Sequence, residues 1–554
     1  MRENLVEKLS KEEGVKENSD YLRGTIAKGL GNPLTGAIAE DDAKLLKFHG
    51  SYQQHDRDLE KERRQQKLEP LYQFMLRVRI AGGVTTPEQW LVMDELADRY
   101  GNGTLKLTTR QSFQMHGILK GNLKPTIKTI NEALMTTIAT CGDVNRNVMC
   151  NPNPYQSKIH GQVYGLAQEV SDYFQPKTKA YYELWLDHKR EIEVPDQEPL
   201  YKKTYLPRKF KIAFCIPPHN DVDIYANDLG FVAIVEEGRL QGFNVKVGGG
   251  MGMTFGDDST YPRLGTPIGF VAPDQVLPVA EAIVSIQRDF GNRVNRKQAR
   301  FKYTIDKYGI DWLKNELPQR FDGKLEDTKP FRLTTNGDQY GWVRGIDGHW
   351  FHTLFVENGR IKDAEGHFLK TAIRKIAELG IGDLRLTGNQ NLIIGSIPEN
   401  DKSKIEEVLK EYHVHEKKHM TGLRLGSMAC VALNTCGLAF AESERYLPSL
   451  LDKIDVLLRE NDLEDRAINI RMTGCPNGCA RSALAEIGFI GRAPGRYNMY
   501  LGASHNGDRL NRLYREMLSE GEILAELAQL LKDYAKTGLP SEHFGDYVVR
   551  MKIV

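Results

Sequence analysis

Apolar and polar side chains alternate along Met75–Ile80, which predicts a β-strand. A helical pattern follows. Thr86 is a candidate N-cap, Pro87 takes the first helical position, and Gln89 three residues on completes a capping box. The alternation returns at Thr104–Thr108. The pattern predicts a strand–helix–strand unit in which one helical face covers a sheet; that face carries Trp90, Met93, Leu96, Ala97 and Tyr100.

The same succession of patterns returns near residue 350. An amphipathic helix is predicted over Phe368–Leu379, and the strand sequence LRLTGNQNLIIGSI (384–397) aligns directly with LKLTTRQSFQMHGI (105–118). Self-similarity of this kind indicates an internal duplication. We therefore expect an α+β fold with two ferredoxin-like halves around a pseudo-twofold axis, and two further α/β domains. The aligned pairs include Leu107/Leu386, Thr108/Thr387, Gln111/Gln390 and Ile118/Ile397.

The two halves differ in chemistry. Arg110 is matched by Asn389, and His116 is matched by Gly395. Because only the first half keeps cationic and hydrogen-bonding groups at these positions, we expect the active site on that side.

Four of the seven cysteines form two pairs near the C-terminus, Cys430 with Cys436 and Cys475 with Cys479. Thiolates are soft ligands, and four of them commonly hold an iron–sulfur cluster. Structural zinc pairs are usually separated by about two to four residues, so the wider first pair argues against zinc. The alternative interpretation is four buried core cysteines, since free cysteine is often buried.

Several basic residues stand beside turns or on one face of a strand. Arg77 and Arg79 alternate with apolar neighbours, as do Lys209 and Lys211, and Arg146 lies in a polar loop. Taken singly, each fits a solvated surface charge or an arginine–carboxylate pair. Like charges on one strand face repel unless an anion lies between them, which favours an anion site.

Composition excludes some classes of protein. The 75 basic and 74 acidic residues give a net charge of +1, which does not favour a nucleic-acid or membrane-surface role. No apolar stretch approaches the ~18 residues of a membrane span. The charged start is unlike a signal peptide, and an odd cysteine count is unlike a disulfide scaffold, so we expect a cytoplasmic protein.

The rest of the chain supplies further segments. Residues 1–20 are polar and are expected to be mobile, and an extended arm then ends in a charged helix near 56–67. Gly248–Gly252 matches neither GxGxxG nor a P-loop, and close packing against a flat ring system fits it as well as phosphate binding. We predict five parts: an arm (1–68), a first half (69–137), an α/β domain (138–338), a second half (339–415) and a cysteine domain (416–554).

With these motifs the chain resembles the siroheme- and [4Fe-4S]-containing nitrite and sulfite reductases. The cysteine spacing and the repeat identify the family, while YLRGTIA…FHGSYQQHDRD and YLPRKFK are similar to its sulfite branch; NRNV, GGGMGMTFGD and WVRGIDG also take part. The resemblance runs from about Tyr21 to the C-terminus. It implies that the four cysteines hold the cluster and that Cys479 also bridges it to the siroheme iron.

The resemblance also implies roles for other residues. Arg77, Arg146, Lys209 and Lys211 match the sulfite-binding cations, and the siroheme-contacting positions are Lys106, Thr108, Arg110, Gln114, His116 and Asn145. Lys106 falls where an arginine is familiar, so it keeps the charge and loses the planar fork. Asn434 and Gly437 replace prolines expected around the first cysteine pair, which could loosen that loop.

The expected activity is six-electron reduction of sulfite to sulfide. Because no flavin or nicotinamide domain is evident, electrons must come from a partner, and the resemblance implies an NADPH-dependent flavoprotein with ferredoxin as the alternative. Competing functions are a siroheme nitrite reductase, a non-catalytic iron–sulfur electron carrier and a structural zinc module.

Overall fold

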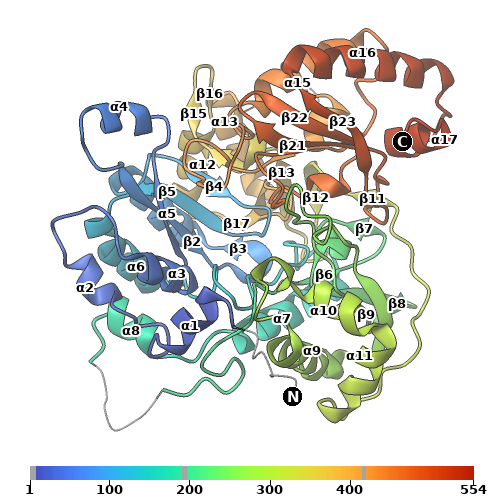
Figure 1. Ribbon diagram of the computed structural model, residues 1–554. Helices are drawn as coiled ribbons and strands as arrows, with labels where there is room; N and C mark the ends of the chain where they lie inside the picture. Colours follow the sequence, from blue (N-terminus) through green and yellow to red (C-terminus); the bar gives the residue numbers. More distant parts are fainter. Residues whose placement is uncertain (1–7, 190–195, 415–419) are drawn as a thin grey trace.

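The computed structural model describes residues 8–189, 196–414 and 420–554. Figure 1 shows the first half in blue at the left, an α/β layer in green at the lower right, and the cysteine domain in orange and red at the upper right. The capping box expected at the start of α5 (Pro87–Arg99) is present, because the Gln89 N–H donates to Thr86 Oγ1 at 3.2 Å and the Thr86 N–H donates to Gln89 Oε1 at 3.1 Å. The predicted strand–helix–strand unit is confirmed.

The duplication is visible as two five-stranded sheets. The first has the order β1 (Ser51–His55), β2 (Tyr72–Val78), β5 (Phe113–Ile118), β4 (Leu105–Leu107) and β14 (Arg360–Ile361). The second has the order β12 (Gly341–Arg344), β13 (Trp350–Leu354), β18 (Leu392–Ile397), β17 (Asp383–Leu386) and β3 (Val84–Thr85). Their helices are α5 and α6 (Leu123–Glu132) in one half, and α12 (Leu369–Glu378) and α13 (Lys402–Glu411) in the other.

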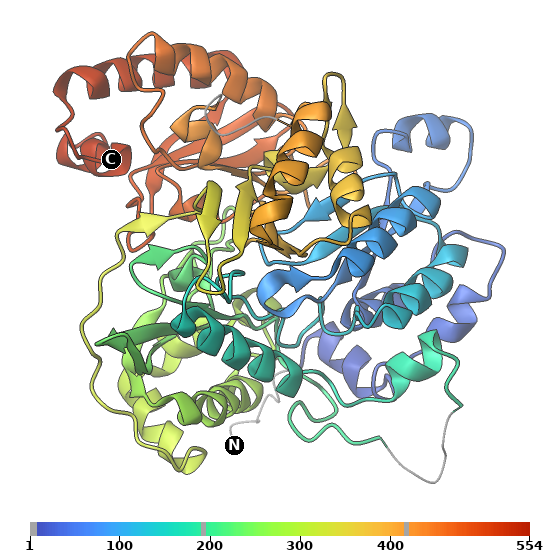
Figure 2. The same cartoon turned by 180° about the vertical axis from the view of Figure 1, so that it is seen from behind.

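Each half contributes one strand to the sheet of the other half. β14 comes from the second half and pairs with β4, while β3 comes from the first half and pairs with β17. On the opposite side α5 and α12 lie next to each other (Figure 2), joined by ion pairs from Lys370 and Arg374 to Asp94 and Asp98. The expected pseudo-twofold arrangement of α+β halves is confirmed, and the strand exchange makes it one folding unit.

Two glycines make the exchange possible. A Cβ on Gly83 would lie 2.2 Å from the Leu386 carbonyl oxygen, and a Cβ on Gly359 would lie 2.3 Å from that of Leu107. Both residues also have positive φ, +84° and +71°. Leu107 and Leu386 are an aligned pair in the duplication, so the same close backbone approach occurs twice.

We expect Gly359→Ala to destabilise the fold strongly. The substitution adds a backbone clash to the strain of a left-handed conformation, whereas Gly366→Ala meets the same strain at φ +69° with nothing within 4 Å. Gly359→Ala should therefore cost at least about 2 kcal/mol more in unfolding free energy than Gly366→Ala. Urea unfolding followed by circular dichroism measures the difference, and equal midpoints for the two variants would show that the crossing tolerates a side chain.

Two further α/β layers share one topology, which the sequence analysis missed. In the first, β6 (Ile212–Cys215) is parallel to β8 (Leu229–Glu236), and β9 (Arg239–Val247) and β10 (Thr266–Val271) follow antiparallel. In the second, β20 (Ile470–Thr473) is parallel to β21 (Ile487–Ala493), and β22 (Arg496–Leu501) and β23 (Arg512–Leu518) follow antiparallel. β19 (Ser427–Ala429) adds a parallel edge to the second sheet.

Helices cover these sheets. Those of the first layer are α7 (Lys158–Tyr173), α9 (Val276–Phe290), α10 (Phe301–Tyr308) and α11 (Ile310–Glu316). Those of the second are α14 (Gly422–Leu425), α15 (Leu447–Arg459), α16 (Glu520–Thr537) and α17 (Phe544–Arg550). Short pairs complete the fold: β7 (His219–Asn220) with β11 (Thr335–Asn336), and β15 (Asp363–Ala364) with β16 (His367–Phe368). No helix among the described residues is long and apolar enough to cross a membrane.

The N-terminal arm differs from the expectation. It is not extended throughout, because it forms α1 (Lys11–Glu17), α2 (Ile26–Leu30), α3 (Glu40–Leu45) and β1, with the charged helix α4 (Glu60–Gln65) where one was expected. α8 (Ala180–Trp185) lies beyond the first half. Of the segment expected to be mobile, residues 1–7 lie outside the described residues, and residues 8–20 include the buried pair Glu13 and Lys16. The five-part division stays a prediction, although β1 joins the first half-sheet.

Candidate cofactor and anion site

The two cysteine loops leave the same edge of one sheet. Cys430 follows β19 and Cys475 comes shortly after β20, and these strands are parallel, so their carboxyl ends meet. The Gly474 N–H donates to Cys430 Sγ at 3.3 Å, and Asn477 Nδ2 donates to Cys475 Sγ at 3.4 Å. Amide donors to sulfur are among the features that tune iron–sulfur clusters.

The raised pKa values of these thiols are compatible with a metal cluster. Burial and the neighbouring thiol of Cys479 raise the pKa of Cys475 to about 11, and the same two causes raise the pKa values of Cys430 and Cys436. Such thiols keep their protons unless a metal displaces them, because metal binding requires the thiolate. The four sulfurs therefore form a soft donor set suited to a [4Fe-4S] cluster. Cys479 is the exposed member of the four.

An arginine of the arm holds the first cysteine loop. Arg57 Nη1 donates to the carbonyls of Cys436 (3.1 Å) and Ala439 (2.8 Å), and the Arg57 N–H donates to the Asn434 carbonyl (3.3 Å). Asn434 therefore lies in a tethered loop, although a proline was expected there.

The loop that carries Cys479 contacts the first half of the molecule. Thr109 Oγ1 donates to the Cys479 carbonyl at 3.0 Å, and Arg481 Nη1 donates to the Thr109 carbonyl at 2.7 Å. The negative charge of a Cys479 thiolate also acts on Arg77 and Lys209. The structure thus brings the last cysteine and two of the predicted substrate cations to one place.

The four predicted substrate cations, Arg77, Arg146, Lys209 and Lys211, form the group we call the cation group. Arg146 donates to the carbonyls of Thr140 (3.1 Å) and Gly142 (2.8 Å), and Arg77 Nη1 lies 3.5 Å from the same Thr140 oxygen. The Arg146 N–H donates to the Phe210 carbonyl at 2.9 Å, which places the two lysines beside the arginine loop.

The lysines are crowded by positive charge. Burial and then Arg300 and Arg208 lower the pKa of Lys209 to about 7, and burial and then Lys209 hold the pKa of Lys211 well below its usual range. No ion pair is found for either ammonium among the described residues. An anionic ligand beside these two lysines would favour their protonated forms, so the pair suits an anion site. Arg79, by contrast, donates to Ser171 Oγ and to the Ser171 carbonyl, a structural contact outside this group.

Several buried polar atoms beside the cation group have no hydrogen-bond partner in the part of the chain described. They are Arg77 Nε, Arg110 Nε, Asn147 Oδ1 and both amide atoms of Asn145. Leaving such a group unpaired costs ~1–3 kcal/mol, so native proteins usually satisfy it. The orphaned atoms are consistent with a polar ligand, and they include two predicted siroheme contacts, Arg110 and Asn145.

Other predicted siroheme contacts lie on neighbouring strands. Gln114 Oε1 accepts from Arg77 Nη2 at 3.0 Å, and its amide nitrogen lies 2.8 Å from His116 Nε2. Burial lowers the pKa of His116 to about 3, so its ring is neutral. Thr108 caps its turn through Oγ1, which accepts from the Arg110 N–H at 3.2 Å.

Lys106 is the exception among these residues. Its ammonium is buried in an ion pair with Glu444 Oε2 at 2.6 Å, and Arg360 pairs with the same carboxylate. The charge of Lys106 is therefore already matched, and its role as a siroheme contact stays a prediction.

The glycine-rich loop packs against other backbone. The Met253 N–H donates to the Pro476 carbonyl at 2.9 Å, and a Cβ on Gly252 would lie 3.1 Å from the Asn477 carbonyl oxygen. A Cβ on Gly249 would lie 2.2 Å from the Tyr225 carbonyl oxygen. The glycines let this loop approach other backbone, including the second cysteine loop, and its packing against a flat ring system stays a prediction.

Sequence reasoning missed the residues that support the site. Asp143, next to the arginine loop, pairs with Arg296 (2.9 Å) and with Lys16 of the arm (3.6 Å), and these charges hold its pKa at about 2 against the effect of burial. Asp223 pairs with Arg471 (2.6 Å) and Arg481. Both acids and their partners are far apart in sequence, so no local pattern reveals them.

The low pKa of Lys209 predicts a pH effect on the cofactor-free protein. A lysine whose pKa falls from 10.5 to about 7 on folding gives up protons that the unfolded chain keeps, so stability should rise with pH from about 7 to 8.5. Thermal unfolding of the wild type and of Lys209→Met across this range isolates the contribution. Parallel curves for the two proteins would mean that Lys209 keeps an ordinary pKa.

Comparisons with known proteins agree with this geometry. Residues 65–133 and 344–412 match the family model described as the nitrite/sulfite reductase ferredoxin-like half domain, and residues 167–325 match the nitrite and sulphite reductase 4Fe-4S domain. The latter range holds the first α/β layer and ends before the four cysteines. The second layer, which carries them, has the same topology.

Curated relatives match along the whole chain. A protein of Anoxybacillus flavithermus named "Sulfite reductase [NADPH] hemoprotein beta-component" is 58% identical over 98% of this chain and 95% of its own length. One with the same name from Staphylococcus saprophyticus is 56% identical over 100% and 97%. The solved structure of Mycobacterium tuberculosis NirA protein has a TM-score of 0.80 at 23% identity, covering 98% of this chain and 97% of that one, a likeness in fold. The chain belongs to the nitrite and sulfite reductase family.

Proposed function

We propose that this chain reduces sulfite to sulfide at a siroheme coupled to a [4Fe-4S] cluster. The observation that carries the proposal is the meeting of Cys479 with the cation group and its orphaned polar atoms. The curated relatives' names include sulfite reductase and hemoprotein, which agrees with it.

In this proposal the cysteine loops would hold the cluster, and Cys479 would also hold the siroheme. Once bound, the two groups would pass on electrons from the donor component and provide the iron centre at which the anion is reduced. Siroheme carries eight carboxylates, and the predicted contacts around the site offer it donors from both strands and loops. Arg110 and Asn145 present unpaired donor atoms, and Gln114 and His116 line the adjoining strand β5.

The cation group would bind and orient sulfite. Arginine offers planar donors to an oxyanion, and lysine a compact charge that also carries a proton. Three oxygens leave sulfite as water, so each must be protonated. Lys209, with a pKa of about 7, can give up a proton near neutral pH and take one back from solvent. The arm, through Lys16 and Asp143, keeps the arginine loop in position.

The relatives' designation as a beta-component implies a second component. We propose an NADPH-dependent flavoprotein as electron donor, with ferredoxin as the alternative, and a cytoplasmic location, since free thiols and a cluster suit a reducing compartment.

The isolated, cofactor-loaded chain should reduce sulfite with a chemical donor such as reduced methyl viologen and should be inactive with NADPH alone. Adding a purified flavoprotein component should restore NADPH-dependent turnover. NADPH oxidation by the chain alone would contradict the need for a donor.

The same assay separates sulfite from nitrite. We expect a higher kcat/KM for sulfite, because the crowded cations suit a dianion better than a monoanion. A higher kcat/KM for nitrite would make the chain a nitrite reductase with the same site.

A further inference from the structure

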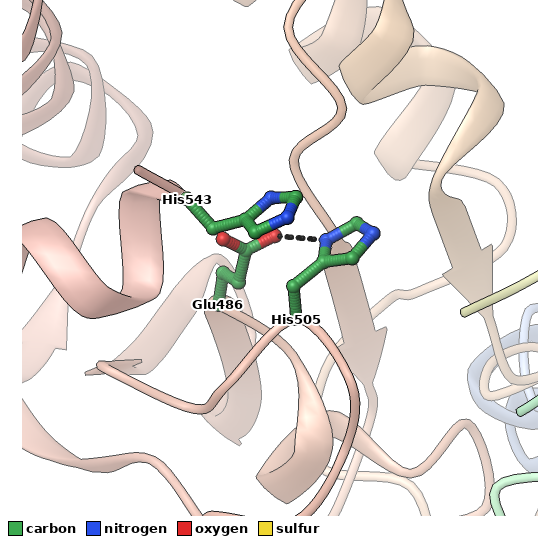
Figure 3. A group of neighbouring side chains, drawn as sticks. All are labelled: Glu486, His505 and His543. Carbon is green, nitrogen blue, oxygen red and sulfur yellow. Dashed lines mark hydrogen bonds and ion pairs between the residues drawn. The ribbon is translucent and has the colours of Figure 1, made fainter. Parts of the chain in front are cut away.

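Three side chains converge in the cysteine domain, away from the cysteines. Glu486 directly precedes β21, His505 follows β22, and His543 caps the start of α17. Figure 3 shows the carboxylate and the two rings pointing toward one another. One ligand atom from each lies within 4.8 Å of the other two. Glu486 Oε2 is 3.0 Å from His505 Nδ1, and the two rings are parallel with centroids 4.0 Å apart.

The carboxylate is fully buried and needs a positive partner. The topologically equivalent acid in the first α/β layer is Asp228, which directly precedes β8 as Glu486 precedes β21. Asp228 is also fully buried, and Arg300 Nη2 binds its two oxygens at 3.0 and 2.9 Å. In the part of the chain described, the ion pair found for Glu486 is with His505, and two stacked imidazoles take the place of the guanidinium.

The surroundings orient these groups as metal ligands are oriented. The Gly545 N–H donates to Glu486 Oε1 at 2.9 Å, and the Asn469 N–H donates to Oε2 at 2.8 Å. The carboxylate is therefore held in place by two backbone N–H groups beside the two imidazoles, and hydrogen bonds that orient a ligand in this way are usual around metal centres.

We propose that Glu486, His505 and His543 bind one divalent transition-metal ion of the zinc class. Two imidazoles and one carboxylate suit Zn²⁺, with water completing the coordination. The parallel rings must tilt for one ion to lie in both ring planes, and His543, at the start of α17, is only half-buried.

Such an ion would supply the charge that Arg300 supplies to Asp228. It would also fasten α17 to the loop after β22, whose Asn506 carbonyl accepts from Asn220 of the first α/β layer at 2.8 Å. The role is structural, linking the C-terminal helix to the layer interface, and it is separate from the cofactor site.

The test uses the cofactor-loaded chain, stripped with EDTA, equilibrated with Zn²⁺ and freed of excess metal by gel filtration. Elemental mass spectrometry should find one zinc ion per chain in the wild type, and Zn²⁺ should raise the midpoint of its thermal unfolding. His505→Ala and His543→Ala should retain less than about a tenth of that zinc. His188→Ala, which removes an exposed histidine elsewhere, should retain all of it.

Siroheme absorbance reports whether each variant is folded. If His543→Ala or His505→Ala does not fold, the wild type still decides, because the rise in its thermal midpoint needs no variant. Zinc retained equally by wild type and folded variants would overturn the site. A wild-type protein that retains no zinc and shows no change in its thermal unfolding midpoint would also overturn the site. The three residues would then only hydrogen-bond near the start of α17.

Discussion

Replacing Cys479 with serine is expected to disturb the cluster and the siroheme together and to lower sulfite turnover by more than ~100-fold. Cys479 is the exposed member of the four cysteines, and its carbonyl accepts from Thr109 of the first half, so its sulfur is the one we propose to reach both groups. Serine supplies a harder, poorly ionised ligand. Absorption spectra, iron and acid-labile sulfide content, and turnover with a chemical donor measure the three effects.

The control is Cys215→Ser. The thiol of Cys215 is buried in a separate apolar cluster and donates to the His219 carbonyl at 3.0 Å, so this change should leave both spectra intact. A Cys479→Ser protein with an altered cluster signal and an unchanged siroheme spectrum would rule out a shared sulfur. The cluster assignment would survive that result.

Local patterns predicted the first duplication because each copy fits its strands and helix into a short stretch, Leu76–Leu105 and Leu354–Leu384, and the side chains of the two copies align. The second duplication escaped because its two copies share geometry rather than residues. Asp223 and Arg481, both in left-handed conformation before a short 3₁₀ helix, occupy equivalent places and pair with each other across the layers. Opposite charges at matching positions hide the repeat from alignment and stabilise the interface between its copies.

The periodicity of apolar residues could not predict the strand exchange either. β3 and β14 have two residues each, too few for an alternating pattern, and only Gly83 and Gly359 mark the crossings. The arm was misjudged for a related reason. From the sequence alone, Lys16 and Glu13 look like solvent-exposed charges. They form a buried ion pair because residues far along the chain, such as Asp143, pack against them.

The candidate site was predicted unevenly. Spacing alone predicts the cysteines as ligands, since a metal cluster constrains residues close in sequence. The cations needed the family resemblance, because an unpaired buried arginine and a surface arginine look alike in a sequence. Lys106 shows the limit: its burial against Glu444 depends on a residue 338 positions away. The predicted site would thus draw its thiols from one α/β layer and its cations from the other layer and from the first half-sheet.

Truncating the cation group is expected to lower sulfite reduction by ~100- to 1,000-fold while the cofactors stay bound. Arg146→Ala removes a guanidinium fixed by the Thr140 and Gly142 carbonyls, and Lys211→Ala removes an ammonium for which no ion pair is found among the described residues. In the proposed mechanism both positive charges would stabilise the developing negative charge of the substrate. Turnover with reduced methyl viologen at saturating and limiting sulfite separates a loss in kcat from a loss in affinity.

The matched controls are Arg239→Ala and Lys324→Ala, which remove exposed cations of the same kinds elsewhere. They should leave turnover and spectra unchanged, which excludes an effect of net charge. Lys211→Arg should recover part of the activity if charge is what matters, since arginine keeps it in a bulkier form. Near-normal turnover in both alanine variants at limiting sulfite would mean that the anion binds elsewhere.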